Sequence, residues 1–503
     1  MLLPVAVQAQ LSPTADQVRE KVQKSCFGSR SEPVLIQGGG EQMGVDMTYW
    51  AILHPDGRFV MQTEGLLPGT SGFDGKTCWS VDWGGTPQTL RLSDRHRTLA
   101  TTWFPYGLAL QPDGPITFSL DESSEMDDDD EGVLVAGVRV GDFESRLLVN
   151  RESWLPVGLE YKSEAGTPVR QTFADHRQVL GVTLPFFVSS VQEGGFVDEF
   201  RIDSVQEAPR TLADPFAPRQ ARPTDMEFDP DQPSEVKVRR VPSGHILIRA
   251  SLDGGDERWF ILDSGAGAMC ISPEVADEFE MESFGKVPAA GVGGLTVSRF
   301  RRGASLTVGP LYLANPTFVE LDLAFLEPLF GVEIAGICGF GLFSRAVVVL
   351  DLKQNTLALH DPDQFQLENP KWEDLILYSR HPVVRASFEG DHAGLLRIDT
   401  GAGGTVTFHA NSVKKYALLE DRETNASAAG GVGGMIQMRT GQIAWFELGG
   451  HRFEHPSVDF AIEDKGAFSD EDIDGNLGTR FLEPFRLVFD YANERIAFVE
   501  RKP

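Results

Sequence analysis

The sequence predicts a mainly β protein: an N-terminal antiparallel β-rich domain with a short helix, followed by two homologous closed β-barrel lobes. Two observations support this fold class. Short β-rich runs alternate with turn signals in the first part of the chain, and the last part carries one series of glycine-rich motifs twice in the same order. The length of 503 residues suits about three domains, and 41% apolar and 24% charged residues are typical of a globular chain.

The N-terminal β-rich accessory domain is expected to cover residues 11–205. Turn signals with the sequences PDG at 55–57 and FDG at 73–75 separate its β-rich runs. Eight acidic residues crowd into the segment 121–131. Like-charge runs are usually solvated loops, so we predict a loop there, with a calcium site as the alternative.

A short helix is predicted to open this domain. Ser12 is the expected N-cap, and Pro13 suits the first turn because its missing N–H would be unpaired there anyway. The helix is expected to end near Ser25.

A proline-rich segment at 206–235 is the predicted linker. Its six prolines favour an extended, semi-rigid backbone over packed structure. The remainder of the chain is divided into lobe 1, residues 236–365, and lobe 2, residues 366–503, because it repeats itself.

Four landmarks recur in this remainder at nearly constant offsets of 136, 140, 139 and 139 residues. Such regularity predicts two homologous lobes. The paired segments are 261–267 with 397–403, 291–294 with 431–434, 336–339 with 475–478, and 348–351 with 487–490.

The first of these pairs carries a candidate for chemistry. In each copy an apolar strand leads to Asp, then a small hydroxyl residue, then Gly. A single copy is an ordinary turn sequence. Two homologous lobes related by a pseudo-twofold axis would bring Asp263 and Asp399 side by side, where their titrations become coupled. Such a pair can activate a water, one carboxylate taking its proton while the other protonates a substrate carbonyl.

Residues 236–503 resemble the bacterial two-lobed aspartic proteases of the retropepsin-like and pepsin-like group, the aspartyl protease family. This resemblance implies the acid protease fold, with closed β-barrel lobes facing each other. It also implies Asp263 and Asp399 as the catalytic pair. Ser264 and Thr400 would form hydrogen bonds across the lobe interface, and Gly265 and Gly401 would let the two loops touch. These last four residues support the catalytic loops: Ser264, Gly265, Thr400 and Gly401.

The other repeated segments fit the same family pattern. The segments 336–339 and 475–478 resemble the apolar-apolar-Gly supports beneath each catalytic loop, although Asn476 makes the second support partly polar. Two glycine-rich segments fall where flaps would lie, and glycine suits a hairpin that opens over a peptide. Neither segment contains the tyrosine of pepsin-like flaps. The flap candidates are Gly291, Gly293, Gly294, Gly431, Gly433 and Gly434.

The N-terminal domain resembles the LolA/LolB type of lipoprotein carrier. The resemblance rests on the stretches 72–79, 151–156 and 175–185. It implies a half-open antiparallel barrel with a helical plug, and lipid or lipoprotein is a possible partner. The alternative, which we prefer, is that the tryptophans simply fill a β-sheet core, because a likeness of fold does not carry function. Those tryptophans are Trp50, Trp79, Trp83, Trp103 and Trp154.

The charge balance disfavours a nucleic-acid partner. The chain has 74 acidic and 45 basic residues, a formal net charge of −29, which repels phosphate backbones. No stretch approaches the ~18–20 apolar residues of a membrane-spanning helix. We therefore predict a peptide or unfolded protein as the partner, with no nucleic acid and no transmembrane segment.

The first ten residues, MLLPVAVQAQ, are signal-like. They begin apolar, and Val7-Gln8-Ala9 fits the small-residue pattern before a cleavage site. We interpret residues 1–10 as a residual signal segment and expect a periplasmic or secreted bacterial protein. The alternative is that this start has no targeting role.

The cysteine spacing argues against a structural zinc site, since no CxxC pattern occurs. Cys26 and Cys78 are candidates for one disulfide in an exported chain. Cys270 and Cys338 lie in apolar or small-residue runs, which favours burial.

The histidines are expected to be structural or on the surface. His451 and His455 are four residues apart but lack the H-E-x-x-H pattern, and His381 and His409 lie near the second catalytic strand. We predict no metal and no other cofactor.

The sequence therefore predicts an aspartic endopeptidase. A second hypothesis is a catalytically weak or inactive protein that binds peptides or lipoproteins through the cleft and the N-terminal barrel. The missing flap tyrosine and Asn476 motivate that alternative. A third is autoprocessing, with the N-terminal domain as a propeptide cut near the proline-rich linker.

Overall fold

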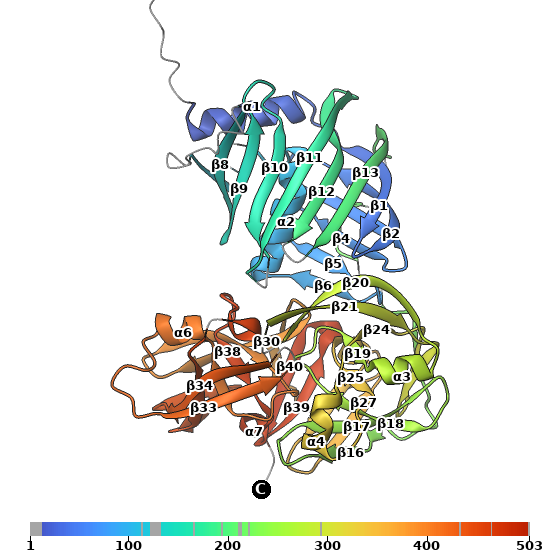
Figure 1. The fold of residues 1–503 in the computed structure, drawn as a ribbon, viewed down its shortest axis with the longest axis vertical. Coiled ribbons are helices and arrows are strands. Elements are labelled where there is room, and N and C mark those ends of the chain that lie inside the picture. Colours follow the sequence, from blue (N-terminus) through green and yellow to red (C-terminus); the bar gives the residue numbers. More distant parts are fainter. Residues whose placement is uncertain are drawn as a thin grey trace, which may run out of the picture.

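The computed structural model is mainly β, as the sequence predicts (Figure 1). It describes residues 13–500 except 112–113, 121–131, 164–165, 193–194, 210–213, 220–221, 292–293, 432–433 and 464. The acidic run therefore lies outside the described residues, as do the signal-like segment and Ser12.

The N-terminal part is a single 13-stranded sheet in which every neighbouring pair is antiparallel. Its order runs from β6 back to β1, then from β13 back to β7, so the two arms meet where β1 pairs with β13. The strands are β1 (Val34–Gln42), β2 (Val45–Leu53), β3 (Phe59–Gly65), β4 (Gly69–Phe73), β5 (Cys78–Val81), β6 (Pro87–Leu90), β7 (Ile116–Leu120), β8 (Val133–Val140), β9 (Phe143–Asn150), β10 (Pro156–Lys162), β11 (Pro168–Val179), β12 (Val182–Gln192) and β13 (Phe196–Glu207).

Two helices complete this domain: α1 (Ala15–Cys26) and α2 (Leu92–Tyr106). α1 is capped by Thr14 rather than by Ser12, because Thr14 and Gln17 form a reciprocal capping box. Pro13 therefore precedes the helix. α2 connects the two edge strands β6 and β7, and the sheet curves around it (Figure 1).

The side chains of α2 fill the inner side of the sheet. Trp103 and Phe104 are at most 1% exposed, and they belong to one core cluster with residues of both arms. Trp79 is buried as well, whereas Trp50 and Trp154 pack as partly buried residues. These contacts match the core-filling interpretation for these four tryptophans, whereas Trp83 packs against Phe300 and Arg380 of the lobes.

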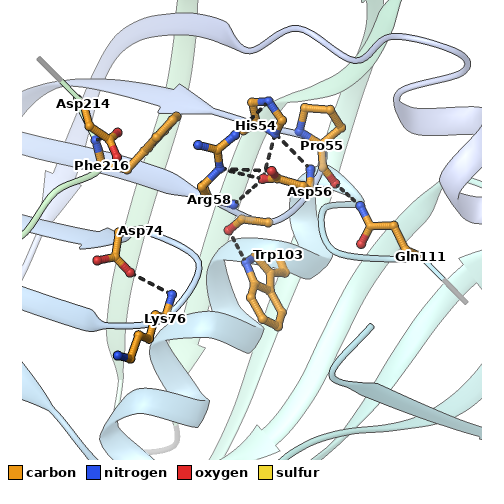
Figure 2. A network of polar contacts seen from close by, with 11 residues as sticks. His54, Pro55, Asp56, Arg58, Asp74, Lys76, Trp103, Gln111, Asp214 and Phe216 are labelled. Carbon is orange, nitrogen blue, oxygen red and sulfur yellow. Dashed lines mark hydrogen bonds and ion pairs between the residues drawn. The ribbon is translucent and has the colours of Figure 1, made fainter. Parts of the chain in front are cut away.

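The turn between β2 and β3 is fastened to α2 (Figure 2). The indole Nε1 of Trp103 donates to the Gly57 carbonyl at 2.7 Å, and the Gln111 amide donates to Pro55 O at 2.9 Å. Asp56 accepts from both the backbone and the side chain of Arg58. The PDG sequence is thus a turn, as predicted, and Gly57 has a φ of 102° that favours glycine.

The two C-terminal lobes have the same strand order. Lobe 1 runs β23-β22-β17-β18-β25-β19-β24-β21-β20, and lobe 2 runs β36-β35-β30-β31-β38-β32-β37-β34-β33. Equivalent parallel pairs occur in both, β18 with β25 and β31 with β38. The sequence repeat is therefore a structural repeat. Among the described strands, no hydrogen-bonded pair closes either strand order into a ring, so the prediction of closed barrels is not confirmed. The last strands of the two orders, β20 and β33, form hairpins with β21 and β34.

The elements of lobe 1 are β16 (Val238–Arg240), β17 (Ile246–Leu252), β18 (Glu257–Leu262), β19 (Met269–Ile271), α3 (Pro273–Glu278), β20 (Glu282–Gly291), β21 (Gly294–Arg302), β22 (Ser305–Val308), β23 (Leu311–Ala314), β24 (Thr317–Glu320), η1 (Ala324–Leu326), α4 (Glu327–Phe330), β25 (Gly336–Cys338) and α5 (Phe340–Phe343). Those of lobe 2 are β29 (Ile376–Tyr378), β30 (His381–Phe388), β31 (His392–Ile398), β32 (Val406–Phe408), α6 (Ala410–Lys415), β33 (Asn425–Gly431), β34 (Gly434–Gln442), β35 (Trp445–Leu448), β36 (His451–Glu454), β37 (Ser457–Ala461), η2 (Gly466–Phe468), β38 (Gly475–Leu477), α7 (Thr479–Leu482) and η3 (Tyr491–Asn493).

A six-stranded sheet joins the lobes, because β26 of lobe 1 pairs with β39 of lobe 2. The proline-rich segment also contributes strands: one pairs with β23 of lobe 1, and another pairs with β27 of this joining sheet. The segment is thus attached to the lobes at two places. These elements are β14 (Met226–Phe228), β15 (Glu235–Val236), β26 (Val347–Asp351), β27 (Thr356–His360), β28 (Trp372–Asp374), β39 (Phe485–Asp490) and β40 (Arg495–Glu500).

The N-terminal domain is fixed to the lobes by buried polar contacts. Arg345 is 6% exposed, donates to the Gly84 carbonyl at 2.9 Å, and forms an ion pair with Asp225. Asp94 accepts from the backbone N–H and the hydroxyl of Ser379, at 2.6 and 3.0 Å. None of the described helices is long and apolar enough to cross a membrane.

All four cysteines are free and buried, so the candidate disulfide between Cys26 and Cys78 is absent. The Cys26 side chain packs against Gly107 at the end of α2, where an added Cβ would lie 2.5 Å from its sulfur. Cys78 is held in β5 between β4 and β6. Cys270 and Cys338 are buried, as predicted.

Thiol titration is expected to find four reactive thiols per chain in denaturant without reductant, and none that reacts rapidly in the native protein. Burial raises the pKa of Cys26 and of Cys78 to about 12, which suppresses the reactive thiolate. Labelling with a chromogenic disulfide reagent checks this. A count of two thiols in denaturant would show that the disulfide between Cys26 and Cys78 forms after all.

Candidate active site

The two predicted catalytic aspartates follow equivalent strands. Asp263 comes directly after β18 and Asp399 directly after β31. Each backbone N–H is bound by the neighbouring parallel strand, Asp263 by the Cys338 carbonyl and Asp399 by the Leu477 carbonyl, both at 3.0 Å. Because these strands are buried, both carboxyl groups are fixed at the ends of rigid elements, and both residues remain partly exposed.

The two aspartate-containing loops, loop 1 (263–267) and loop 2 (399–403), touch across the lobe interface, as the glycines at their tips permit. A Cβ placed on Gly265 would lie 2.5 Å from Oδ1 of Asp399, and one on Gly401 would lie 2.3 Å from Cγ of Asp263. Real Cβ atoms do not approach so closely, so any larger residue would push the opposite carboxyl group away. The structure therefore brings the two carboxyl groups together.

Two hydroxyl groups lock the loops in a reciprocal arrangement. The Thr400 hydroxyl accepts from the Ser264 N–H at 2.8 Å and donates to the Leu262 carbonyl at 2.9 Å. The Ser264 hydroxyl accepts from the Thr400 N–H at 3.1 Å and donates to the Ile398 carbonyl at 2.7 Å. Both residues are at most 1% exposed. Each lobe thus satisfies polar backbone groups of the other.

The electrostatics of the pair favour one shared proton. Burial, then the charge of Asp399, raises the pKa of Asp263 to about 8. Burial also raises the pKa of Asp399, but the nearby Arg397 and hydrogen bonds from the Gly401 and Ala402 backbone oppose that rise. Asp263 is therefore the protonated partner near neutral pH, and Asp399 is the carboxylate.

The repeated segments 336–339 and 475–478 support the loops from below. Gly339 is needed because a Cβ there would lie 2.3 Å from the Ala268 carbonyl. In lobe 2 the departure at Asn476 has a consequence, since its amide donates to Oδ2 of Asp399 at 3.3 Å. His409 in turn lies 3.1 Å from Oδ1 of Asn476.

The two glycine-rich segments form hairpins, where flaps were expected. β20 and β21 pair up to Gly291 and Gly294, and β33 and β34 pair up to Gly431 and Gly434. Gly293 and Gly433 lie outside the described residues. The first hairpin contacts η2 of lobe 2, so it reaches across to the other lobe. A cavity of about 790 Å³ lies beside this hairpin, and none of its lining residues belongs to the catalytic loops.

The N-terminal domain also holds the first hairpin, which Figure 1 shows lying beneath that domain. Lys286 N–H donates to the Met43 carbonyl at 2.6 Å, and Arg302 donates to the Leu66 carbonyl at 2.8 Å. Trp83 packs edge-on against Phe300 of β21.

Two histidines lie beside these loops: His381, which was expected to be structural or on the surface, and His245, which no prediction singled out. His381 of lobe 2 lies by loop 1, with ring atoms 3.4 Å from the Cβ position of Gly267. His245 of lobe 1 precedes β17 and forms a hydrogen bond with the backbone of Gly401 in loop 2. Burial lowers the pKa of the His245 ring below its usual value, and this hydrogen bond offsets part of that decrease. Both close a Ser-x-His sequence, at 243–245 and 379–381, separated by the same 136 residues as the aspartates. A longer alignment of the two halves would have found them.

The two histidines differ in whether the serine two positions before each of them bonds the imidazole ring. In lobe 1 the Ser243 hydroxyl pairs with Nδ1 of His245 at 2.9 Å. In lobe 2 the Ser379 hydroxyl bonds Asp94 of the N-terminal domain instead, and Nδ1 of His381 is buried without a hydrogen-bond partner among the described residues. His451 and His455 lie on or beside β36, and the described residues contain no cluster of three or more metal-ligating side chains.

The comparisons with known proteins return the two families that the motifs resemble. Residues 248–340 match the family model described as Aspartyl protease, a span that includes Asp263 and ends before Asp399. No curated protein matches the chain. Among solved structures, the chain is similar to a retropepsin-like aspartic protease from Rickettsia conorii, at 17% identity and a TM-score of 0.20, covering 27% of this chain and 92% of that one.

Similar structures for the N-terminal part include a LolA superfamily protein from Nitrosomonas europaea. It shows 16% identity and a TM-score of 0.31, covering 40% of this chain and 96% of that one. A DUF1329 family protein from Desulfovibrio piger follows, with 6% identity and a TM-score of 0.28, covering 38% of this chain and 91% of that one. The two resemblances stated from the sequence are thus confirmed as resemblances.

Thr400→Val is expected to lower the free energy of unfolding by about 1–3 kcal/mol, because it leaves the buried Ser264 N–H and Leu262 carbonyl without a partner. Thr400→Ser keeps the hydroxyl and is the matched control. Urea denaturation of both variants measures the difference. Equal stability of the Val and Ser variants would refute the role of the hydroxyl.

Asp263→Asn is expected to stabilise the fold at pH 8 and to change little at pH 4. Between about pH 4 and 8 the folded chain holds a proton that the unfolded chain releases, so the free energy of unfolding falls as pH rises through this window. The amide removes this loss, and a gain of roughly 2–4 °C in Tm at pH 8 corresponds to about 1 kcal/mol. A variant less stable than the parent at pH 8 would contradict the raised pKa.

Proposed function

We propose that the protein is an aspartic endopeptidase that hydrolyses peptide bonds with a water activated between Asp263 and Asp399. The observation that carries this proposal is the reciprocal Ser264 and Thr400 arrangement, which brings two carboxyl groups from homologous loops into contact. The Aspartyl protease match over residues 248–340 supports the same class of enzyme. Two carboxyl groups held this close would be costly to keep for a purely structural purpose, because they cannot both ionise cheaply.

The reaction follows from the unequal protonation of the pair. Asp399, as the carboxylate, takes a proton from water while the water oxygen bonds to the peptide carbonyl carbon. Asp263 gives its proton to the carbonyl oxygen, which produces a neutral tetrahedral diol. In the second step Asp399 passes its proton to the amide nitrogen, the C–N bond breaks, and Asp263 recovers a proton from a diol hydroxyl. Both residues return to their initial states.

We propose an extended peptide or unfolded protein as the substrate. A strand lying between hairpins can bind through backbone hydrogen bonds, while pockets select alternate side chains. Both hairpins present exposed apolar residues, Val297 at 60% and Met435 at 61%. Such exposure favours substrates with apolar side chains near the scissile bond.

We also propose export to the periplasm or the cell exterior, on the strength of the signal-like residues 1–10. For the N-terminal domain we propose a structural role rather than lipid binding. A lipid would have to displace α2, whose Trp103 and Phe104 fill the inner side of the sheet. Autoprocessing at the linker would leave the N-terminal domain in place, because its contacts with Arg345 and Ser379 lie outside the linker.

Asp263→Asn and Asp399→Asn are each expected to lower kcat on a peptide library by about 10²- to 10⁴-fold, the usual contribution of general acid–base catalysis. Asp391→Asn is the matched control: it makes the same change at an exposed turn with φ 57°, which Asn tolerates. Mass spectrometry of the cleaved library gives the rates.

The parent enzyme should lose activity as pH rises through about 8, where Asp263 releases its proton, and also at low pH, where Asp399 is protonated. Full activity in either aspartate variant would overturn the proposal. Retention of peptides without any cleavage, at every pH tested, would instead favour the binding-protein alternative.

A further inference from the structure

We infer that Asn476 and His409 are positioning residues that decide which catalytic aspartate carries the charge, by directing an amide N–H at Asp399. This inference rests on the proposed function and adds to it the residues that break the symmetry of the two lobes. It starts from a difference between equivalent segments of the internal repeat.

The two lobes differ at two positions that touch each other. Asn476 occupies the place of Ile337 in the repeated support segments. His409 precedes α6 as Ser272 precedes α3, and both make the same backbone bond to the support region, His409 to Asp474 and Ser272 to Ala335. Ser272 caps its helix, whereas His409 makes no capping bond. Lobe 1 thus has an apolar residue and a helix-capping residue at these positions. Lobe 2 has two polar side chains there, and they form a hydrogen bond with each other.

This pair is buried and directed at the site. Asn476 is 5% exposed, and His409 is fully buried with its ring edge-on to Phe468. The chain of contacts runs from His409 Nε2 to Asn476 Oδ1 at 3.1 Å, and from Asn476 Nδ2 to Asp399 Oδ2 at 3.3 Å. Burying a polar group costs free energy unless it is hydrogen-bonded. Each of these two contacts therefore needs a donor on one side and an acceptor on the other.

The protonation of His409 decides which atom donates and which accepts in these two hydrogen bonds. Burial, together with the charge of Arg397, lowers the pKa of His409 to about 4, so the ring is neutral where the pair of aspartates shares a proton. Nε2 of His409 faces Oδ1 of Asn476, an oxygen that can only accept, which places the ring hydrogen on Nε2. Nε2–H then donates to the Asn476 carbonyl oxygen. The amide N–H₂ is left to donate to Asp399, and a donor stabilises the carboxylate form.

The other charged groups around this chain are accounted for. Asp399 faces Asp263 from loop 1 and Arg397 from its own strand, and Arg397 also pairs with Asp470 at 3.4 Å. His409 faces Arg397, Asp474 and the backbone of Asp470. Asp263, by contrast, accepts from backbone N–H groups at Gly265 and Gly401, and the position equivalent to Asn476 in its own lobe is the apolar Ile337. Among these groups, the Asn476 amide is the side-chain donor that one aspartate has and the other lacks.

The test is the pH profile of kcat/KM for Asn476→Ile, which gives lobe 2 the residue of lobe 1. Loss of the donor should raise the acid limb, set by Asp399, by about one pH unit, and should move the alkaline limb, set by Asp263, less. Ile337→Val in the equivalent segment of lobe 1 is the control and should leave the acid limb in place. An unmoved acid limb in Asn476→Ile, or an equal shift in Ile337→Val, would overturn the inference.

A second pair of variants leaves Asn476 intact. His409→Leu removes the donor to the amide and should move the acid limb in the same direction, whereas His409→Gln retains an N–H donor and should stay closer to the parent. Imidazole ¹⁵N NMR, with the His409 signal assigned by its loss in His409→Gln, should show the hydrogen on Nε2. A hydrogen on Nδ1, or equal profiles for the Leu and Gln variants, would reject the direction we assign.

Failure of the proposed function is distinguishable from failure of this inference. If the parent protein cleaves no peptide, the proposed function fails, and the inference is tested by carboxyl ¹³C NMR titration of Asp399 in the parent and in Asn476→Ile. A higher Asp399 pKa in the variant supports the inference without any turnover. An unchanged Asp399 titration overturns it.

Discussion

The interaction on which the site depends is the exchange of hydrogen bonds between Ser264 and Thr400 across the lobe interface. Two carboxyl groups repel each other once both are ionised, and burial makes each ionisation more expensive. The loops nevertheless stay in contact, because each buried hydroxyl bonds both a donor and an acceptor of the opposite loop. Separating the loops would leave four buried polar backbone groups without partners, and that penalty holds the carboxyl groups together.

The internal repeat of the two lobes places the two carboxyl groups together, and differences between the lobes make the two groups unequal. The lobes share one strand order, the same hydroxyl pair and the same glycine contacts. The surroundings of the two carboxyl groups differ, because Asn476 donates to Asp399 whereas the equivalent support position in lobe 1 is the apolar Ile337. A proton shared by equal carboxyl groups has no preferred position, so this difference would separate the acid from the base in the proposed mechanism.

The N-terminal domain has a core of its own and also supports the two C-terminal lobes. It bonds the first hairpin through Met43 and bonds the turn before β30 through Asp94. That turn holds Ser379 and Arg380 in left-handed backbone, with φ values of 48° and 66°, which non-glycine residues adopt only when their surroundings compensate. The Asp94 carboxylate supplies that compensation beside catalytic loop 1.

The mainly β class, the internal repeat, the turn at Gly57 and the two aspartates can be predicted from the amino-acid sequence, because each depends on local chemistry or on similarity between halves of one chain. The residues that contact those aspartates are known only from the folded structure. The free state of Cys26 and the open strand orders depend on packing between distant segments. His381 and His409 looked like ordinary histidines because their partners, Gly267 and Asn476, lie in other strands and loops. A hydrogen bond between residues more than 60 positions apart leaves no local pattern, and folding alone brings its donor and acceptor together.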